Sequence, residues 1–315
     1  MNSLELTQKI KNFALEEAGF DLVGISPAKL AATHEAALKT WIQNNFHGSM
    51  DYMARDPERR ANPEKVLPSA RSVISLAVNY FHPEDEKPEK TPAGKVAKYA
   101  YGKDYHKVIE KKLKRLSRFI MEISGSGVEV KSYVDTGPVL EKAFAAQGGL
   151  GFFGKNTNII TRNYGSWVFL ASLLTNLELV ADEPHTGSCG SCRICLDACP
   201  TEALLGNYQM DATKCISYLT IEDKTPAVAH NHASSKTGEW IFGCDICQDV
   251  CPYNFRAKTT RHAELYPDKK AGTWLSVEKI NSMNQEEFQE SFQGSPVKRP
   301  KLTGMRRNTE LLKSL

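Results

Sequence analysis

The chain has 315 residues, of which 41% are hydrophobic and 24% are charged, and its formal net charge is +3. Such values are typical of an ordinary soluble protein with room for two domains, and the net charge is too small to indicate a partner. No apolar run approaches the roughly 18 residues of a membrane span, and the first residues lack the basic start and apolar core of a signal peptide. We therefore expect a cytoplasmic protein with no membrane partner.

The first part of the chain is predicted to alternate helices and strands. Leu6 and Ile10 share one face of a helix expected over residues 4–18, which ends at Gly19. The apolar segment 71–80 is a candidate for a buried strand. The other elements expected here are a strand over 20–25, a helix over 27–45 and a loop over 82–95.

An amphipathic helix is predicted to follow Asp104, which can cap it. Ile109 and Leu113 begin an apolar stripe with spacings of four and three, and the opposite side is basic from Lys107 to Arg118. This basic face is either an ordinary solvated surface or a phosphate-binding surface, since Lys and Arg dominate affinity for nucleic acids. A second basic group lies in the tail and comprises Lys298, Arg299, Lys301, Arg306 and Arg307.

The segment up to about residue 180 is predicted to complete an α/β or α+β domain. A strand is expected over 128–134, followed by Asp135-Thr-Gly-Pro and a helix over 139–147. After a glycine-rich loop, the segments 158–161 and 167–174 are typical of a hairpin around the turn Asn163-Tyr164-Gly165.

The glycine-rich loop, Gly149-Leu-Gly-Phe-Phe-Gly154, matches two nucleotide-binding patterns in part. It follows a helix and leads to a hairpin, whereas a Rossmann fingerprint leaves a strand and opens a helix. With Lys155 it nearly spells a P-loop, but Asn156 stands where a magnesium-binding Ser or Thr is required. We reject both, although Lys155 in such a loop can still bind another phosphate.

The eight cysteines all lie between Cys189 and Cys251. The first four form a C-x2-C-x2-C-x3-C-P run, a spacing that wraps three thiolates around one iron–sulfur cube and sends the fourth to another. The second copy is broken, and Cys215 must supply its displaced first ligand. The two-cluster rule therefore predicts one [4Fe–4S] cluster held by Cys189, Cys192, Cys195 and Cys251 and another held by Cys199, Cys215, Cys244 and Cys247.

Zinc and disulfides are the alternatives to iron–sulfur clusters. C-x2-C pairs also suit tetrahedral zinc, but zinc gives no reason for triplets of cysteine or for the proline after each last cysteine. Disulfides are disfavoured by the cytosolic character of the chain. We interpret His230 and His232 as part of a solvated loop, because eight cysteines already complete two clusters.

Five stretches around the cysteines make the chain resemble the epoxyqueuosine reductase family. They are spread over roughly residues 1–260 and are collectively very specific. The stretches are Lys98-Tyr-Ala-Tyr-Gly-Lys-Asp104-Tyr105-His106, Val134-Asp135-Thr-Gly-Pro138, Gly151-Phe-Phe-Gly-Lys155-Asn156, Cys215-Ile-Ser217-Tyr-Leu-Thr-Ile-Glu222 and Gly243-Cys-Asp-Ile-Cys-Gln-Asp-Val-Cys-Pro252.

The resemblance implies an α+β fold in which a cobalamin-binding domain, similar to reductive dehalogenases and nitroreductases, is joined to a two-cluster ferredoxin-like domain. It implies an oxidoreductase that uses cobalamin to reduce epoxyqueuosine to queuosine at the wobble position of tRNA, the last step of queuosine biosynthesis. The partners implied are this tRNA and an external low-potential electron donor of the flavodoxin or ferredoxin type, and the enzyme is expected to be a monomer.

The same resemblance suggests three regions. Residues 1–180 would bind cobalamin and carry out catalysis, and residues 181–260 would hold the two clusters. Residues 261–315 resemble the start of a C-terminal helical-repeat extension. Helical repeats need neighbours to bury their faces, so no repeat domain is expected in these last residues.

Asp135 is the candidate proton donor, since removing an epoxide oxygen takes two electrons and two protons and yields water. Taken alone, Asp135 is more simply a helix cap, whereas the resemblance favours an acid whose pKa is raised in a partly desolvated site. Lys155 could hold the phosphate of the nucleotide tail of cobalamin, and His106 could equally be a capping or core histidine. The expected cofactor contacts are Asp104, Tyr105, His106, Lys155, Asn156, Asn158 and Ser217.

Three other functions are compatible with these residues. A reductive dehalogenase would use the same cofactors but usually carries an export signal. A non-enzymatic electron carrier would bind no corrinoid. A nucleic-acid-binding protein with structural clusters would resist reduction and would not turn over modified tRNA.

Overall fold

The computed structural model describes residues 1–89, 91–224 and 236–313. Its largest sheet has four antiparallel strands in the order β1-β2-β7-β4. The strand β2 is buried along its whole length, and its Ile74 lies opposite Ile25 of β1 and Leu173 of β7. The strands are β1 (Leu22–Pro27), β2 (Ser72–Asn79), β7 (Val168–Thr175) and β4 (Val130–Tyr133).

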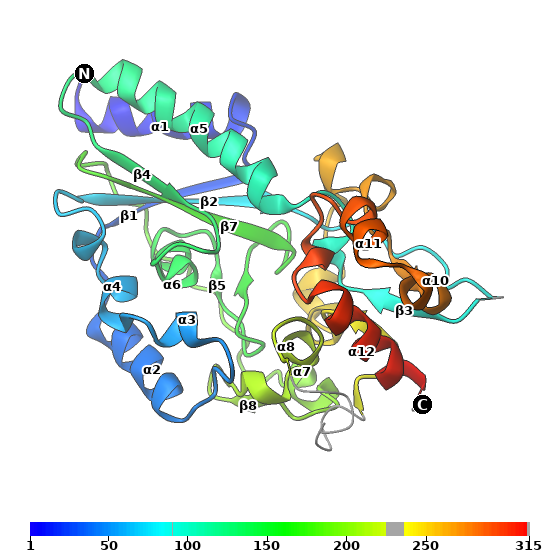
Figure 1. The fold of residues 1–315 in the computed structure, drawn as a ribbon. Coiled ribbons are helices and arrows are strands. Elements are labelled where there is room, and N and C mark those ends of the chain that lie inside the picture. Colours follow the sequence, from blue (N-terminus) through cyan, green and yellow to red (C-terminus); the bar gives the residue numbers. More distant parts are fainter. Residues whose placement is uncertain (90, 225–235, 314–315) are drawn as a thin grey trace.

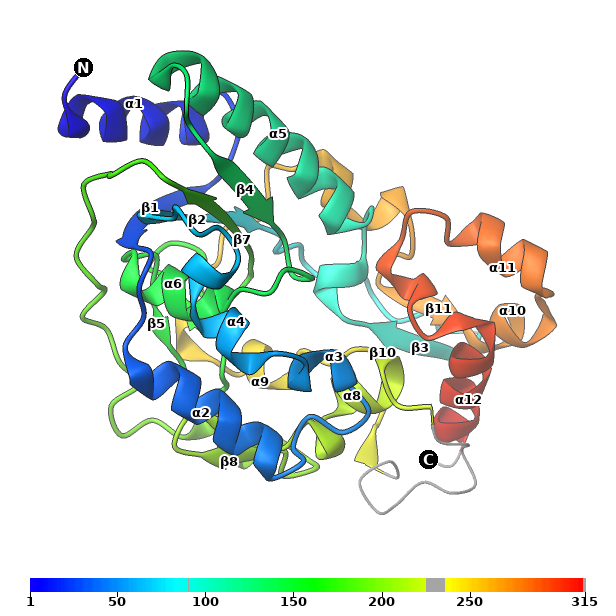
Figure 2. The ribbon, with the colours of Figure 1, turned by 60° about the vertical axis from the view of Figure 1, so that its left-hand side comes forward.

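Helices cover both faces of this sheet, as Figures 1 and 2 show, and the fold is α+β as expected. On one face α1 (Ser3–Glu16) packs against α5 (Tyr105–Ser124), with the rings of Phe13 and Phe119 stacked 3.9 Å apart. The other face is covered by α6 (Glu141–Gln147). Three further helices lie on that side, namely α2 (Ala32–Gln43), α3 (Asp51–Ala54) and α4 (Pro57–Ala61).

Helix α5 has the amphipathic pattern predicted for it. Asp104 caps it, because its Oδ1 accepts a hydrogen bond of 3.0 Å from the backbone N–H of His106. The apolar stripe around Ile109 is buried in the main core. On the basic side Lys111 is exposed, whereas Lys112 donates to the carbonyl of Gly19 over 2.8 Å. Within the described ranges, neither this helix nor any other is both long and apolar enough to cross a bilayer.

The hairpin predicted over 158–174 is wrong. The strand β6 (Ile159–Ile160) pairs with β5 (Phe152–Phe153) from the glycine-rich loop, while β7 enters the main sheet between β2 and β4. Only a bridge between Thr161 and Gly165 closes the turn. The reason is that β7 is apolar on both faces and gains more burial between two strands than in a two-stranded hairpin.

Asp135 is not a helix cap. Helix α6 begins at Glu141, and its cap residue is Leu140, which makes no side-chain capping bond. Asp135 instead lies in the loop after β4 with φ of 58°, in the left-handed region that Asp and Asn tolerate better than most residues. The helix expected over 27–45 is likewise shorter than predicted, since α2 begins at Ala32 and ends at Gln43.

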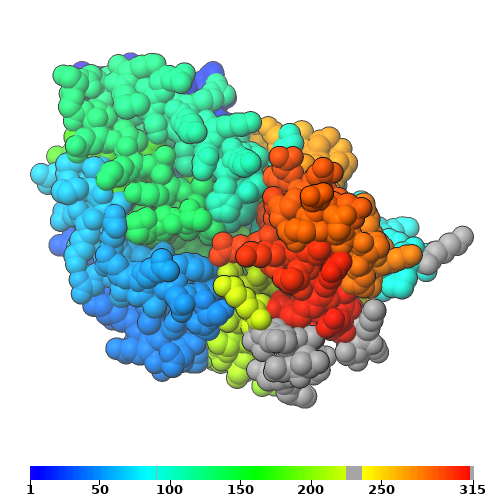
Figure 3. All heavy atoms as spheres, in the orientation of Figure 1, coloured from blue at the N-terminus to red at the C-terminus, as the bar shows by residue number. Residues whose placement is uncertain are grey.

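A second, smaller core contains residues from all three predicted regions. Its sheet has the order β10-β3-β11, from Trp240–Phe242, Ala93–Val96 and Trp274–Ser276. Helices α10 (Val277–Ser282), α11 (Gln285–Ser291) and α12 (Lys301–Lys313) complete it. Figure 3 shows these orange and red residues packed directly onto the rest of the surface. The domain boundaries therefore stay a prediction, and this sheet crosses them.

Three polar side chains of α12 are buried, namely Arg307, Asn308 and Thr309, and the first two bind backbone carbonyls of other segments. Asn308 donates to the carbonyls of Thr220 and Ile241 over 2.7 and 2.8 Å. Arg307, which belongs to the basic tail, is 8% exposed and donates to the carbonyl of Leu219 over 2.7 Å. Arg307 is therefore a packing residue and is not available to an RNA phosphate.

The cysteine segment folds into short elements. The helix α7 contains Cys195 and packs against α9, which contains Cys247. His230 and His232 lie outside the described residues. The elements are α7 (Ile194–Ala198), β8 (Leu204–Gly206), β9 (Gln209–Met210), α8 (Ile216–Ile221) and α9 (Ile246–Asp249).

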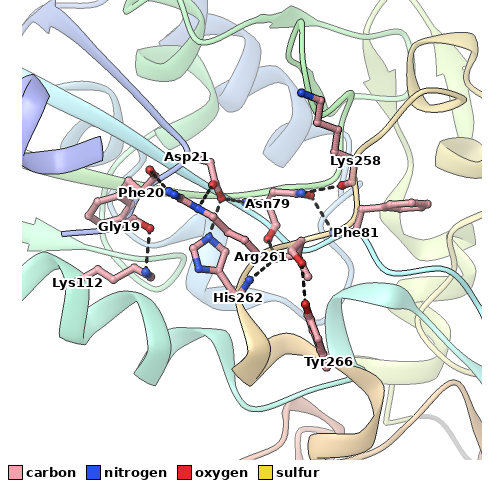
Figure 4. A network of polar contacts seen from close by, with 11 residues as sticks. Gly19, Phe20, Asp21, Asn79, Phe81, Lys112, Lys258, Arg261, His262 and Tyr266 are labelled. Carbon is pink, nitrogen blue, oxygen red and sulfur yellow. Dashed lines mark hydrogen bonds and ion pairs between the residues drawn. The ribbon is translucent and has the colours of Figure 1, made fainter. Parts of the chain in front are cut away.

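A buried polar network joins the segment after the last cysteine to the main sheet (Figure 4). The carboxylate of Asp21, 3% exposed, accepts from Arg261 and from the ring of His262, each over 2.8 Å. Burial raises the pKa of Asp21, but the bonds from His262 and from the backbone N–H of Asn79 outweigh burial and hold the pKa below its usual value. Asn79 also donates to the carbonyl of Lys258 over 2.8 Å. These contacts hold residues 258–262 against the sheet.

Candidate functional site

Two cavities meet at the rings of Tyr99 and Tyr105, which line both of them. The inner cavity has a volume of about 340 Å³ and lies beside the cysteine segment. The outer cavity has a volume of about 700 Å³ and is lined by Asp135 and its neighbours. The arrangement places the predicted electron-carrying residues and the predicted acid on opposite sides of two tyrosines.

The inner cavity brings together four of the predicted cofactor contacts, Tyr105, Asn156, Asn158 and Ser217. Asn156 is buried, and its side chain accepts from the backbone N–H of Asn158 over 3.2 Å. Aromatic rings form another part of the wall. The cavity is also lined by four cysteines, Cys199, Cys215, Cys244 and Cys247, which are those predicted to hold one cluster.

The outer cavity assembles a chain of hydrogen bonds around Asp135. Its Oδ2 accepts from the hydroxyl of Tyr105 over 3.0 Å and lies 3.2 Å from Nε2 of His106. The other ring nitrogen of His106, Nδ1, lies 2.8 Å from Oδ1 of Asp104. Tyr105 and His106 are in the first turn of α5, so the cap by Asp104 positions both of them. One imidazole is thus held between two carboxylates.

The pKa shifts in this hydrogen-bonded chain of side chains differ from the prediction that the pKa of Asp135 is raised. Burial raises the pKa of Asp135, but hydrogen bonds from His106 and Tyr105 outweigh it and hold the pKa below the usual carboxyl value. The expected rise is therefore wrong. Burial lowers the pKa of His106, yet the bonds to Asp104 and Asp135 dominate and raise it to about 9. Near neutral pH the proton resides on His106 and Asp135 is ionised.

Glu141 is a functional candidate that the sequence analysis missed. Its Oε2 accepts from the backbone N–H of Asp135 over 3.1 Å, and its Oε1 is buried without a hydrogen-bond partner among the described residues. Burial, followed by the charge of Asp135, raises the pKa of Glu141 well above its usual value. Glu141 therefore holds the backbone of the Asp135 loop through this hydrogen bond. No motif signals this contact, which depends on how the loop folds back onto α6.

Lys155 lies apart from both cavities. Its Nζ donates to the carbonyls of Gly190 and Cys192, each over 2.8 Å, and its backbone N–H points to Sγ of Cys189 over 3.4 Å. The structure thus brings Lys155 to the loop of the first cysteine triplet and not to Asn156 and Ser217. A contact between Lys155 and a cofactor phosphate stays a prediction.

The eight thiols form two neighbouring groups. Burial, and then the charges of Cys189, Cys251 and Cys192, raise the pKa of the Cys195 thiol. Burial, and then Cys244 and Cys215, raise the pKa of Cys247. Cys195 thus lies near the three thiols predicted to share its cluster, and Cys247 lies near two of its predicted partners and also near Cys195. The ligand sets themselves stay a prediction.

In a [4Fe–4S] cluster each thiolate binds a different iron, whereas four ligands of one zinc ion all bind the same atom and lie closer together. Among the described residues, no three His, Cys, Asp or Glu side chains converge in the way that a single metal ion requires. The two groups of thiols, in contrast, each number four. This donor set fits two clusters of the cubic type.

Basic side chains border the outer cavity. Arg299 forms hydrogen bonds of 3.1 and 3.2 Å with the carboxylate of Glu222, and Lys298 is its neighbour. Arg60 donates to the carbonyls of Tyr52 and Gly137. Of these residues, Lys298 and Arg299 belong to the predicted basic tail, while Arg60 was not predicted. Because Arg299 is paired with Glu222, Arg60 and Lys298 are the cations at this mouth without a carboxylate partner among the described residues.

Two sequence models of known families match the chain. Residues 60–136 match the model described as "Epoxyqueuosine reductase QueG, DUF1730", and residues 188–254 match the "4Fe-4S double cluster binding domain". The epoxyqueuosine reductase of Leadbetterella byssophila is 42% identical over 317 residues, which cover 99% of each chain.

Solved structures give the same result. A crystal structure of an epoxyqueuosine reductase with an epoxyqueuosine-modified tRNA-Tyr stem loop is 32% identical, with a TM-score of 0.90 over 99% of this chain and 81% of the other. A catabolic reductive dehalogenase, at 14% identity and a TM-score of 0.50 over 99% of this chain and 38% of that protein, shares the fold alone.

Proposed function

The chain belongs to the epoxyqueuosine reductase family, and from that premise we propose how its own residues reduce epoxyqueuosine to queuosine in tRNA. Asp135 delivers a proton to the epoxide oxygen, and His106 supplies that proton. The four cysteines that line the inner cavity hold the cluster that delivers electrons to the reacting centre. The observation that carries this proposal is the pair of cavities, with acid groups on one side of Tyr99 and Tyr105 and thiols on the other.

The reaction defines what the outer cavity must do. An epoxide accepts two electrons and two protons, both carbon–oxygen bonds break, and an alkene and water remain. The imidazolium of His106 lies within hydrogen-bond reach of Oδ2 of Asp135, so one proton moves from Nε2 through the carboxyl to the departing oxygen. Tyr105 donates to the same oxygen of Asp135 and orients it.

The geometry explains why Asp135 can act despite its low pKa. Substrate that enters the outer cavity displaces water from the exposed carboxylate and raises the cost of its negative charge. The carboxyl then takes the proton from His106 more readily. Glu141 holds the backbone N–H of Asp135 and keeps the carboxyl turned toward the cavity. Asp135 is in this scheme the proton donor, and Glu141 is a positioning residue.

The inner cavity is proposed to bind part of the corrin ring of cobalamin, because about 340 Å³ cannot hold the whole cofactor. Its aromatic wall suits a flat macrocycle, its Asn and Ser side chains can hydrogen-bond amides, and its position between the thiols and Asp135 matches the path of the electrons. When bound, cobalamin supplies a reduced cobalt for cleavage of the carbon–oxygen bond. The cofactor contacts that this cavity supports are Tyr105, Asn156, Asn158 and Ser217, while Asp104 and His106 serve the outer cavity.

The substrate is proposed to reach the outer cavity as part of tRNA, and its phosphates to contact Arg60, Lys298 and Arg299 at the mouth. Electrons come from an external low-potential donor of the flavodoxin or ferredoxin type.

We also propose a cytoplasmic monomer, with residues 1–180 responsible for catalysis, 181–260 for the clusters and 261–315 for packing beside the substrate cavity. A tRNA substrate and reducible clusters support the cytoplasm.

The proposal is tested with anaerobically reconstituted protein and tRNA that carries epoxyqueuosine, with dithionite as reductant. We expect queuosine to form only when cobalamin is added, and the absorption spectrum to show a bound corrinoid. Protein that binds no corrinoid would be an electron carrier or a nucleic-acid-binding protein. Protein that binds corrinoid but converts an organohalide and not the tRNA would be a dehalogenase.

A further inference from the structure

We propose that an acidic one-electron carrier protein docks on a surface formed by Arg162, Tyr253, Phe255 and Arg256, and from there reduces the cluster held by Cys189, Cys192, Cys195 and Cys251. This surface is called the Phe255 patch below. The inference rests on the proposed function, because it assigns the entry point of the electrons which that function consumes.

The direction of electron flow follows from the two groups of cysteines. All four members of the second group line the inner cavity, and none of Cys189, Cys192, Cys195 and Cys251 does. The first group is therefore farther from the reacting centre. Helix α7, which contains Cys195, nevertheless packs against α9, which contains Cys247, so the two groups are neighbours. Electrons thus enter at the first group and leave through the second.

The Phe255 patch is joined directly to the first group. Tyr253 follows Cys251 by two residues, and its backbone N–H lies against that thiol. The hydroxyl of Tyr253 donates to the carbonyl of Ser188, beside Cys189, over 3.1 Å. These contacts place the side chains of the patch next to two ligands of the first cluster.

The apolar part of the patch has no covering segment among the described residues. The side chain of Phe255 is 71% exposed, more than any other large hydrophobic residue described, and Tyr253 is 47% exposed. Burying an aromatic ring is worth about 1.5–3 kcal/mol, so two exposed rings only two residues apart form an apolar surface that favours an interaction site. Asn254 between them is buried and hydrogen-bonded, which holds the segment rigid.

The charge of the patch selects the partner. Arg162 lies in the Thr161–Gly165 turn, whose Gly165 packs against Tyr253 and Asn254. Arg162 and Arg256 are exposed, and neither forms an ion pair or side-chain hydrogen bond within the described part of the chain. Two free guanidinium groups, one next to Phe255 in the sequence and one on the adjoining turn, attract an acidic protein and accelerate its encounter. The proposed electron donor of the flavodoxin or ferredoxin type is therefore expected to present an acidic surface to the Phe255 patch.

A competing entry point lies beside Cys199. A groove of about 530 Å³ there is lined by Arg193, Asp197, Glu202 and Leu205. Arg193 is already paired with Asp197 over 2.9 Å, which leaves Glu202 as the uncompensated charge. An acidic carrier is repelled from this groove, although Leu205 is 43% exposed. Leu205 therefore provides a matched control for Phe255.

The electron step balances within the proposed pair. A flavodoxin hydroquinone loses one electron and becomes a semiquinone, and the first cluster gains that electron. Two such encounters supply the two electrons of one turnover. No bond within the protein forms or breaks in this step.

The test uses a bacterial flavodoxin as the probe and the reconstituted protein with both clusters. Phe255→Ser and Arg256→Glu are compared with Leu205→Ser and Lys111→Glu. Calorimetry measures the Kd for oxidised flavodoxin, and stopped-flow absorbance follows cluster reduction by the hydroquinone. We expect the first two variants to weaken binding and slow cluster reduction at least tenfold, with wild-type iron content and wild-type reduction by dithionite. The two controls should match the wild type.

Absence of flavodoxin binding by the wild type would overturn the inference, as would equal losses in Leu205→Ser and Phe255→Ser. Unaltered binding by both patch variants would do the same. A failure of the proposed function looks different. In that case dithionite reduces the clusters but no queuosine forms, while binding and cluster reduction still report on the Phe255 patch.

Discussion

The electron-handling and proton-handling regions of this molecule are built in opposite ways. The eight cysteines come from a single stretch, Cys189–Cys251, in which α7 with Cys195 packs against α9 with Cys247 and makes the two groups neighbours. The acid site combines the loop after β4 with the first turn of α5 and the start of α6. The ligands of a cluster can follow one another at short, fixed intervals in the sequence. A proton path instead needs side chains from different elements to lie within hydrogen-bond distance.

This difference also appears in the charges. In the cysteine region burial raises the pKa of the thiols of Cys244 and Cys247. Ionising these thiols without a metal would therefore be costly, and metal binding is what keeps them deprotonated. In the acid region two carboxylates stabilise one imidazolium. The charges of the cysteine region are stabilised by the metal centres that it binds, whereas the charges of the acid region are stabilised by the protein's own side chains. The predictions below separate the two regions by changing one at a time.

The largest effect is expected from removing one cysteine of the inner group. Cys215→Ala should destroy the cluster shared with Cys199, Cys244 and Cys247 and spare the other, so iron per protein falls to about half. Turnover should be lost with every reductant, because electrons cannot reach the inner cavity. Iron analysis and single-turnover assays measure this. Iron that falls to nearly nothing, or does not change, would contradict the crossed pairing.

The next effect is expected from Asp135→Asn. Asparagine tolerates the positive φ of this position and keeps the size of the side chain, but it cannot pass on a proton. General acid catalysis is worth about 100- to 10,000-fold in rate, so single turnover of pre-reduced enzyme should slow by that factor. Iron and cobalamin content should stay at the wild-type level. A near wild-type rate would move the acid to Tyr105 or His106.

A smaller effect, on pH dependence, is expected from Asp104→Asn. The pKa of His106 is about 9 in the fold, above its usual value, so the protonated form is present at lower pH and is lost as pH rises through about 9. Wild-type single turnover should therefore fall in that range. The variant keeps the helix cap but loses one carboxylate beside the imidazole, and its fall should begin at lower pH.

Asp56→Asn is the matched control for Asp104→Asn. Asp56 caps α4 through a bond of 3.0 Å to the backbone N–H of Arg59, and it contacts no histidine. Its variant should keep the wild-type profile. The same linkage predicts that His106 stabilises the fold fully below its ordinary pKa and that this contribution is lost as pH rises through about 9. Profiles of equal shape for the three proteins would exclude His106 as the proton source.

The smallest effect is expected in RNA binding. Lys298→Glu at the mouth of the outer cavity should weaken tRNA binding a few-fold and reduce the slope of log affinity against log salt by roughly 0.7–0.9. Lys111→Glu on the exposed side of α5 should change neither if that face is only solvated. Filter binding over a range of salt concentrations measures both. A larger loss in Lys111→Glu would transfer the phosphate contacts to α5.

The sequence by itself determined much of the chemistry. The cysteine spacing, Asp135 and the family stretches predicted the clusters, the fold class and the reaction, and the comparisons confirm the fold and the family. The stripe on α5 and the buried strand β2 were predicted from their apolar periods and are observed. These features succeed because each depends on residues that are close together in the chain.

Only the tertiary structure decided how those residues are used. The sequence favoured a raised pKa for Asp135, but the position of His106 reversed it. Glu141 became a support for the Asp135 loop, Lys155 joined the cysteine loop, and Arg307 was buried by α12. The charge and role of a side chain depend on its burial and on partners from distant segments of the sequence. Neither burial nor such partners can be predicted from a local period or spacing.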